Sequence, residues 1–530
     1  MGKYLWWQYG TIYEIYPRSF LDTDGDGVGD LRGVAAGLDY LKKLGIDAIW
    51  LSPIYPSPMV DFGYDVSDYT AIHPAFGTMA DFDRLVESAH SRRIRILLDL
   101  VANNSSDEHP WFRESRSSRT SLKRDWYIWR DPGPGGGPPN NWLSEFGGSA
   151  WQLDEATGQY YLHTLHRRQP DLNWRNPDVQ ETMLDVMRFW FDRGVDGFRV
   201  DVMWHLIKDA GFRDNPLNPA YAGGHPYRRL IPRYTEDQPE VHDVVAMMRG
   251  VADEYEERVI VGEIYLPVRQ LVSYYGVGGR GAHLPFNFQL LTEPWNARRI
   301  ERIIEEYERL LPKYAWPNWV LSNHDLPRVA TRVGQDQARI ATMLLLTLRG
   351  TPTLYYGDEL GMEDAPVPEG QMRDPKAANM PGFGLGRDGS RSPMQWSSEP
   401  NAGFTTGEPW LPLAENALRR NVEAQQGNET SMLSFTQRLL ALRRAERALS
   451  TGDYQSVPAS GSVLAFLREG DGRRFLVALN LGGERSTLVP PKRMTFAGEV
   501  VEGTLARRRH KPISGPIELE GNEGLIALLD

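Results

Sequence analysis

Short apolar segments alternate with amphipathic segments along the first two thirds of the chain. The apolar segments span 11–20, 47–54, 94–101, 194–202, 258–265, 282–288, 318–325 and 351–360. Stretches with helical periodicity, such as 31–45, 79–93 and 179–193, lie between them. Strands that alternate with helices indicate an α/β fold with a parallel sheet. Eight of them, without a dinucleotide-type glycine fingerprint after the first, favour a closed (β/α)8 TIM barrel over an open doubly wound sheet.

Two regions depart from this alternation and predict further domains. Residues 104–173 are rich in Gly, Pro, Trp and Asn, and so long a connection after the third strand indicates an inserted subdomain. Toward the C-terminus, short apolar runs separated by turn residues predict an antiparallel β-sandwich. We therefore expect a barrel formed by 1–103 and 174–448, a loop-rich subdomain at 104–173 and an all-β domain at 449–530. The Pro- and Gly-rich segment 361–410 is expected at the top of the barrel.

The composition of the chain argues against several classes of partner and site. The net charge of −11 argues against nucleic acid. The chain has no cysteine, which excludes disulfides, thiol nucleophiles and thiolate metal sites. Its start lacks a basic region followed by an apolar run, and no apolar run is long enough to span a bilayer. We expect a cytoplasmic protein without a membrane partner, either a monomer or a weak homo-oligomer.

Charged residues stand where several of the predicted strands end. They are Asp99, the pair Arg199 and Asp201, Glu263, and the pair His324 and Asp325. In a TIM barrel the active site lies at the C-terminal ends of the strands. A carboxylate within or beside an apolar run is costly in a core. Several carboxylates that repel one another on one rim therefore predict a functional site.

Glycoside hydrolysis fits these residues because it needs two carboxyl groups with different charge states. No histidine- and cysteine-based zinc set and no phosphate loop accompanies them. Arg199 lies two residues before Asp201, so both side chains point to one side of the strand. The guanidinium should keep Asp201 ionised, as a nucleophile requires. Glu263 follows an apolar run, which should raise its pKa and keep it protonated near neutrality.

Seven motifs together resemble the alpha-amylase family of retaining glycoside hydrolases (family 13), in its α-glucosidase and oligo-1,6-glucosidase branch. They are DLVANN (99–104), GFRVD (197–201), GEIY (262–265), LSNHD (321–325), QPDLN (169–173), GYDVSDY (63–69) and GRDGSRSPMQW (386–396). The resemblance covers nearly the whole chain. It implies an exo-acting α-glucosidase that releases glucose from the non-reducing end of short oligosaccharides of the maltose, isomaltose or sucrose type.

Two other interpretations of the same residues remain open. A glucosyltransferase or a sugar isomerase would use the same chemistry, since transfer needs only a well-placed acceptor in place of water. A non-catalytic binding homologue is the alternative from another class. Such relatives usually have lost carboxylates and carry a membrane span, whereas this chain keeps Asp201, Glu263 and Asp325.

The resemblance implies a role for each of the three carboxylates. Asp201 would be the nucleophile that forms a covalent glucosyl intermediate, and Glu263 would be the acid/base. Asp325 would bind the sugar's 2- and 3-hydroxyls more tightly in the transition state. His324 and Arg199 would line the same subsite.

The resemblance also implies the walls of a glucose pocket. Tyr64 would stack beneath the sugar, and Phe146 from the inserted subdomain would form a wall. Ordinary packing is the alternative interpretation of both rings. Asp61, paired with Arg391, would close the pocket at the non-reducing end, which is why we expect an exo-acting enzyme.

Two positions bear on how the pocket is used. Asn104 replaces a histidine that in relatives donates to the substrate's 6-hydroxyl, and the shorter amide should cost about 1–3 kcal/mol of binding or turnover. Asn104→His is therefore expected to raise kcat/KM. Val202, directly after the nucleophile, favours α-1,6 over strict α-1,4 activity in relatives, while the balance of hydrolysis and transfer stays open.

The segment DTDGDGVGD (22–30) matches the first nine positions of an EF-hand loop. Position twelve of that loop requires glutamate, and here it is Gly33, which argues against a calcium sensor. The resemblance implies a structural Ca²⁺ or Mg²⁺ site instead, a choice that the sequence leaves open. Its ligands would be Asp22, Asp24, Asp26 and Asp30 with the carbonyl of Val28. Solvated acidic residues without a metal are the alternative.

Overall fold

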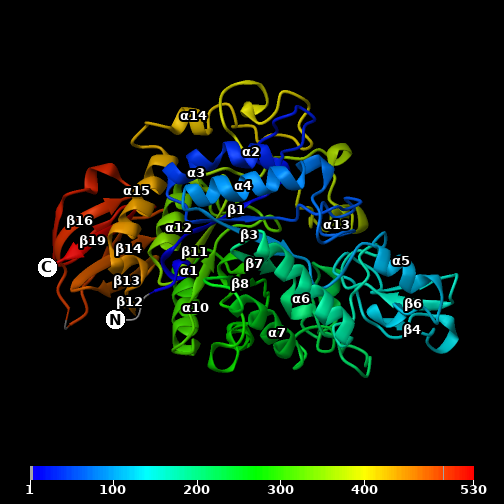
Figure 1. Ribbon diagram of the computed structural model, residues 1–530. Coiled ribbons are helices and arrows are strands. Elements are labelled where there is room, and N and C mark those ends of the chain that lie inside the picture. Colours follow the sequence, from blue (N-terminus) through cyan, green and yellow to red (C-terminus); the bar gives the residue numbers. More distant parts are fainter. Residues whose placement is uncertain (1–3, 493) are drawn as a thin grey trace.

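An eight-stranded parallel sheet forms the centre of the computed structural model, which describes residues 4–492 and 494–530 (Figure 1). Its strand order is β10-β11-β1-β2-β3-β7-β8-β9. The bounds are β1 (Ile12–Ile15), β2 (Ala48–Leu51), β3 (Arg95–Leu100), β7 (Gly197–Val200), β8 (Val259–Gly262), β9 (Leu284–Pro285), β10 (Asn318–Val320) and β11 (Thr351–Tyr355). Each lies inside one of the apolar segments described above, so the prediction of a TIM barrel is confirmed.

The barrel is closed by a side chain between β9 and β10. Within 4–492 and 494–530, no ladder of backbone hydrogen bonds joins these two strands. Asn318 accepts a hydrogen bond from the backbone N–H of Asn287 at 3.0 Å and donates one to the carbonyl of Pro285 at 2.5 Å. Pro285 has no N–H to give to a ladder. A buried amide therefore takes the place of the missing strand pairing.

Helices surround the sheet and cover it with apolar faces. The longer ones are α4 (Met79–Ser91), α6 (Pro177–Asp192), α7 (Val241–Asp253), α10 (Ala297–Leu310), α12 (Gln335–Thr347) and α15 (Met432–Ala445). Helix α4 shows why they form, because Phe82, Leu85, Val86 and Ala89 recur at three- and four-residue spacing and are all buried. Thr78 caps its N-terminus, with its hydroxyl accepting from the N–H of Asp81.

Shorter helices fill the loops. They are α1 (Trp6–Tyr9), α2 (Leu31–Ala36), α3 (Leu38–Leu44), α5 (Pro110–Ser117), α8 (Val268–Leu271), α9 (Gln289–Thr292), α11 (Val329–Val333), α13 (Pro375–Asn379), α14 (Val422–Gln425) and α16 (Arg447–Ser450). None of the helices in the described part of the chain is both long and apolar enough to cross a membrane.

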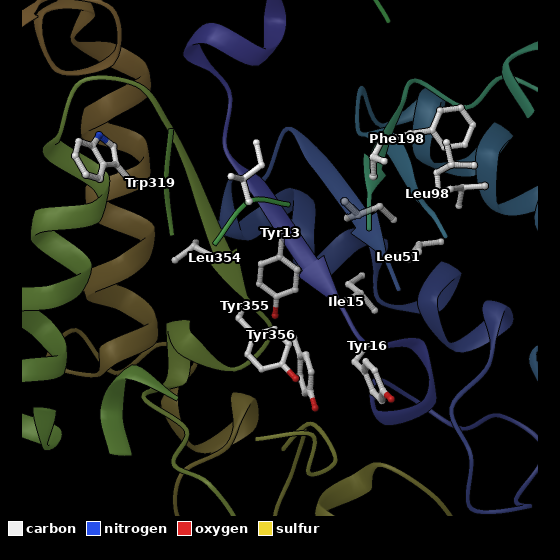
Figure 2. Packing of buried hydrophobic residues seen from close by; sticks show 14 of the residues in the cluster. Tyr13, Ile15, Tyr16, Leu51, Leu98, Phe198, Trp319, Leu354, Tyr355 and Tyr356 are labelled. Atoms are coloured by element: carbon white, nitrogen blue, oxygen red, sulfur yellow. The ribbon is translucent and has the colours of Figure 1, made fainter. Parts of the chain in front are cut away.

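Alternation along the strands separates two apolar clusters. Tyr13 and Ile15 of β1 belong to the large cluster beneath the helices, where Figure 2 shows Tyr13 close to Tyr355 and Tyr356. Ile12 belongs to a second cluster inside the barrel. Because side chains alternate, Glu14 lies on the same side of β1 as Ile12. The same alternation directs charged residues at the ends of other strands into the barrel.

The inserted region carries its own small sheet. Strands β4 (Trp129–Arg130), β5 (Trp151–Asp154) and β6 (Gln159–Leu162) are antiparallel in the order β4-β6-β5. Trp142, Trp151 and Tyr160 lie in a separate aromatic cluster beneath them. In Figure 1 this sheet and α5 lie at the end of the molecule opposite the C-terminal strands. It thus extends one side of the barrel rim.

The C-terminal region is antiparallel, as predicted. Its strands are β12 (Asp453–Ser456), β13 (Val463–Gly470), β14 (Arg473–Asn480), β15 (Ser486–Leu488), β16 (Ala497–Gly503), β17 (Pro512–Ser514), β18 (Ile517–Leu519) and β19 (Gly524–Leu529). A six-stranded sheet, β12-β13-β14-β19-β16-β17, packs against the barrel with one face and against the pair β15-β18 with the other. The borders predicted for the three domains stay predictions.

Candidate active site

One guanidinium gathers the carboxylates at the ends of three neighbouring strands. Arg199 of β7 places Nη1 2.8 Å from Asp99 Oδ1 and 2.6 Å from Asp201 Oδ1. Its Nη2 lies 2.7 Å from Glu263 Oε2. The side chains of all four residues are almost completely buried. The structure therefore brings together the residues that alternation along the strands directs into the barrel.

The charges of this cluster do not balance if all three carboxyl groups are ionised. Burial raises the pKa of Glu263 to about 7, although Arg199 opposes the shift. Burial also raises the pKa of Asp201 against the pull of Arg199, so the prediction that the guanidinium alone keeps this carboxyl group ionised is wrong. A single guanidinium faces Asp201, Glu263 and the buried Asp99, so the pair Asp201–Glu263 shares a proton near neutrality.

Asp201 presents a free oxygen to the cavity. Among the residues described, its buried Oδ2 has no hydrogen-bond partner, and the side chain lines the cavity at the barrel's top. A buried polar atom without a partner is costly unless a ligand uses it. The free oxygen is thus suited to attack a bound substrate.

Val202 connects the two reactive carboxyl groups through the backbone. Its N–H donates to Glu263 Oε2 at 2.7 Å. To do so it adopts the left-handed conformation, with φ of +37° and ψ of 46°. For a β-branched residue this conformation is strained. The backbone turn after Asp201 therefore fixes the position of Glu263.

Tyr64 and His324 form a neutral layer beside the cluster. Their rings stack with centroids 5.4 Å apart, and the Tyr64 hydroxyl lies 2.8 Å from His324 Nε2. The other ring nitrogen, Nδ1, lies 2.5 Å from Glu14 Oε1. Burial lowers the pKa of His324 to about 3 and raises the pKa of Glu14 well above its usual range. The pair therefore shares one proton and carries no net charge at pH 7.

Asp325 is held in the ionised state. Its Oδ1 lies 3.3 Å from Arg387 Nη1 and 3.1 Å from Arg391 Nη2. Burial alone would raise the pKa of Asp325, but the guanidinium groups of Arg387 and Arg391 keep it well below the usual range. The side chain is 25% exposed and reaches the cavity. It can accept hydrogen bonds from ligand hydroxyls.

The predicted pairing of Asp61 with Arg391 is wrong. Asp61 Oδ1 lies 2.6 Å from Nη2 of Arg387, which Asp374 also holds at 2.7 Å. Arg391 instead donates to the backbone carbonyl of His324 at 2.8 Å and to Asp325. Both arginines belong to the motif GRDGSRSPMQW. Because this segment is irregular, the sequence did not indicate which of the two side chains reaches Asp61.

These residues surround a cavity of about 270 Å³. Of the predicted residues, Asp61, Tyr64, Phe146, Asp201, Glu263, His324 and Asp325 line it, whereas Arg199 and Arg391 lie behind them. Asn104 also lies outside the lining, because its Nδ2 donates to the carbonyl of Tyr64 at 3.0 Å. The predicted contact of Asn104 with a 6-hydroxyl and its cost stay predictions.

Other lining residues were missed in the sequence. They include Glu145, Trp204, His205, His225, Arg228, Lys376 and Arg387. Arg387 stands in a quoted motif and could have been considered with Arg391. Glu145 and His225 lie in loops, and Trp204, His205, Arg228 and Lys376 lie in helical segments too short for periodicity to indicate the direction of a side chain.

The acidic loop gathers part of its predicted ligand set. Oxygen atoms of Asp22, Asp24 and Asp30 lie within 4.8 Å of one another. Asp26 is outside this group and accepts from the N–H of Val28 at 2.8 Å. Loss of solvation and the adjacent Asp26 raise the pKa of Asp24, which shows that negative charge is not fully compensated there. The donors fit a hard cation such as Ca²⁺ or Mg²⁺.

Comparisons with known proteins agree with this geometry. Residues 14–452 match the family described as alpha amylase, catalytic domain. A probable alpha-glucosidase of Rhizobium meliloti is 42% identical over 507 residues, 92% of each chain. An oligo-1,6-glucosidase of Parageobacillus thermoglucosidasius is 38% identical over 86% of each chain. The crystal structure of the alpha-glucosyl transfer enzyme XgtA superposes with a TM-score of 0.94 at 40% identity over all of both chains. With its barrel, its carboxylate cluster and these relatives, the chain belongs to the alpha-amylase family of glycoside hydrolases.

Proposed function

We propose that the protein is an exo-acting retaining α-glucosidase that releases glucose from the non-reducing end of short α-glucosides. The ion pair between Asp61 and Arg387 carries this proposal. It lies in the wall of the cavity that holds Asp201 and Glu263. A closed end leaves room for a terminal sugar and excludes a chain that continues past it. The names of the relatives support the same substrate class.

In the proposed reaction, Oδ2 of Asp201 attacks the anomeric carbon of the terminal glucose. Glu263 gives its proton to the glycosidic oxygen as that bond breaks, leaving a covalent glucosyl ester on Asp201. Glu263, now ionised, takes a proton from water, and the resulting hydroxide displaces Asp201 from the sugar. Two inversions retain the α configuration.

Arg199 and Asp325 act on the charges of this reaction. Arg199 contacts both reactive carboxyl groups, so it stabilises whichever of them is ionised. Asp325, ionised and reaching the cavity, accepts from the sugar's 2- and 3-hydroxyls and binds them more tightly when the ring flattens. Tyr64 and the neutral His324 present a flat surface to the sugar.

A substrate panel tests the proposal. We expect turnover of maltose, isomaltose and p-nitrophenyl α-glucoside. A maltooligosaccharide blocked at its non-reducing end should not react, while the unblocked compound should. Cleavage of the blocked compound would contradict exo action, and failure on every α-glucoside would favour a binding homologue.

A pair of variants tests the closed end. Arg387→Ala removes the ion-pair partner of Asp61 and should lower kcat/KM for maltose about 5- to 150-fold, which corresponds to about 1–3 kcal/mol. The variant should also accept the blocked substrate. Arg373→Ala is the matched control, since its side chain is exposed in the same loop region. Equal kinetics for the two variants would exclude a closing role for Arg387.

A glucosyltransferase or sugar isomerase is the second candidate. The likeness to XgtA supports it, as does that to trehalulose synthase MutB of Pseudomonas mesoacidophila, with a TM-score of 0.91 at 34% identity over all of both chains. Product chromatography at high substrate concentration distinguishes the two. Free glucose alone supports hydrolysis, and new disaccharides or longer products support transfer.

Three further properties belong to this proposal. Asp22, Asp24 and Asp30 would hold a structural Ca²⁺ or Mg²⁺, which neutralises their charge when bound. We propose a cytoplasmic location. We also propose that the protein is a monomer or a weak homo-oligomer. Light scattering across a range of protein concentrations measures its oligomeric state.

A further inference from the structure

A second cluster of ligating side chains lies beside the proposed active site. Glu145 from the inserted region, His205 after β7 and Glu236 before α7 each offer one atom, and these atoms lie within 4.8 Å of one another. Glu145 and His205 also line the cavity that contains Asp201 and Glu263. The mechanism proposed above uses none of these three residues.

His205 is prepared to act as a ligand. Its Nδ1 lies 3.1 Å from the carbonyl of Thr235, which can only accept, so Nδ1 carries the hydrogen. Nε2 therefore presents its lone pair, and among the described side chains it has no hydrogen-bond partner, although the residue is 0% exposed. This atom lies 4.0 Å from Glu236 Oε1. A backbone acceptor on one ring nitrogen is the usual means of orienting a metal-binding histidine.

The two glutamates are also held by neighbours. Tyr227 donates its hydroxyl to Glu236 Oε1 at 2.9 Å. His225 Nε2 lies 3.3 Å from Glu145 Oε2, while its Nδ1 accepts from the N–H of Tyr227. Such outer contacts fix carboxylate ligands in metal sites. Hydrogen bonds thus orient two of the three donors, His205 and Glu236, while Glu145 lies next to His225.

We propose that Glu145, His205 and Glu236 form a binding site for a first-row transition metal such as Zn²⁺. One imidazole nitrogen with two carboxylates suits Zn²⁺ rather than Ca²⁺ or Mg²⁺, which take oxygen ligands. Three protein ligands leave a coordination position open, and the cavity borders this position. The site therefore differs in metal preference from the acidic loop at Asp22, Asp24 and Asp30.

Arg228 lies near one of the proposed ligands, Glu236. Its Nη1 lies 4.0 Å from Glu236 Oε1, and its side chain is 48% exposed, so it can turn away toward solvent. Arg228 and Zn²⁺ compete for the same negative charge. Removing the guanidinium should consequently tighten metal binding.

Occupancy should inhibit the enzyme, a consequence that rests on the proposed function. A dication held by Glu145 and His205 would lie in the cavity wall and reduce the space for the substrate. Inhibition should be reversed by EDTA.

Zinc titration by calorimetry and equilibrium dialysis tests the site directly, in the absence of substrate. Wild type should bind one Zn²⁺ here, and Glu236→Gln should weaken binding at least about tenfold while keeping an oxygen for Tyr227. Glu240→Gln, an exposed neighbour at the start of α7, is the matched control and should bind as wild type does. Arg228→Gln should bind more tightly, and Asp24→Asn should bind equally.

Two measurements keep the proposal falsifiable if a variant folds poorly. Circular dichroism checks the fold of each variant, and X-ray absorption of zinc-loaded wild type should show one imidazole ligand. Oxygen-only coordination, or equal zinc affinity in Glu236→Gln and Glu240→Gln, would overturn the proposal. Because binding is measured without substrate, an inactive enzyme that binds zinc contradicts the proposed function alone.

Discussion

Two regions of this molecule collect carboxylates, and they treat them in opposite ways. Around Arg199 the acidic groups are buried, and one guanidinium is the counter-charge for Asp99, Asp201 and Glu263. In the loop 22–30, backbone N–H groups accompany the carboxylates, and Asp24 is exposed to water. Charge that water or an ion can reach holds a loop in place. Burial raises the pKa values of carboxyl groups, so they can gain or lose a proton near neutral pH, which acid/base chemistry requires.

The largest effect should come from the buried cluster. Asp201→Asn removes the nucleophile and should lower kcat/KM on p-nitrophenyl α-glucoside on the order of 10⁴-fold or more. Asp185→Asn on the exposed face of α6 is the control and should change kcat/KM less than about twofold, within the range of surface substitutions. A mild effect of Asp201→Asn would exclude a covalent glucosyl intermediate on this residue.

Removing the Arg199 guanidinium from the buried cluster should lower the free energy of unfolding. Arg199→Gln leaves three buried carboxyl groups without a cation and should lower the free energy of unfolding by about 3–5 kcal/mol. Arg188→Ala breaks an exposed ion pair with Glu254 and should cost about 0–1 kcal/mol. Denaturant unfolding compares the two, and similar losses would remove the distinction between buried and exposed charge.

The loop should respond to a chelator in stability rather than in activity. If Ca²⁺ is present at 100 times its Kd, its removal should lower the free energy of unfolding by about 2.7 kcal/mol. The kcat measured below the unfolding temperature should stay nearly unchanged. Differential scanning calorimetry with and without EDTA gives the first value. An Asp24→Asn variant should lose the response, and a persistent response would assign the cation to another site.

Glu263 links the buried cluster to pH in two ways. Its pKa of about 7 means that the proton required by the leaving group is lost as the pH rises through 7, so kcat/KM for maltose should fall on the alkaline side. p-Nitrophenyl α-glucoside has a better leaving group and needs less protonation. A pH profile of Glu263→Gln on this compound should lack the alkaline limb; an unchanged limb would assign it to another group.

The same group should make the wild type less stable at high pH. The pKa of Glu263 is raised from an ordinary 4.5 to about 7, so the folded chain holds this proton more tightly than the unfolded chain. Stability therefore falls as the pH rises from 4.5 to 7. Glu263→Gln should add about 1–3 kcal/mol to the free energy of unfolding at pH 8 and almost nothing at pH 4. An equal gain at both pH values would indicate a packing effect.

Sequence reasoning succeeded where regular structure determines direction. Alternation along β7 was enough to place Arg199 and Asp201 on one side, and the contacts confirm that geometry. In irregular loops the chain path decides, which is why Arg391 was assigned to Asp61 when Arg387 makes the contact. Glu145 and Glu236 show the same limit, since residues from separate loops meet only after the barrel has formed.

Val202 has a consequence for protein engineering. The residue directly after the proposed nucleophile is the one whose left-handed backbone directs an N–H at Glu263. Substitutions there change the backbone strain and the position of that N–H together. Glycine and asparagine adopt this conformation with less strain. The most thermostable members of a variant library at position 202 should therefore carry one of these two residues. Selection for heat resistance alone would therefore change the residue whose backbone positions the proposed acid/base.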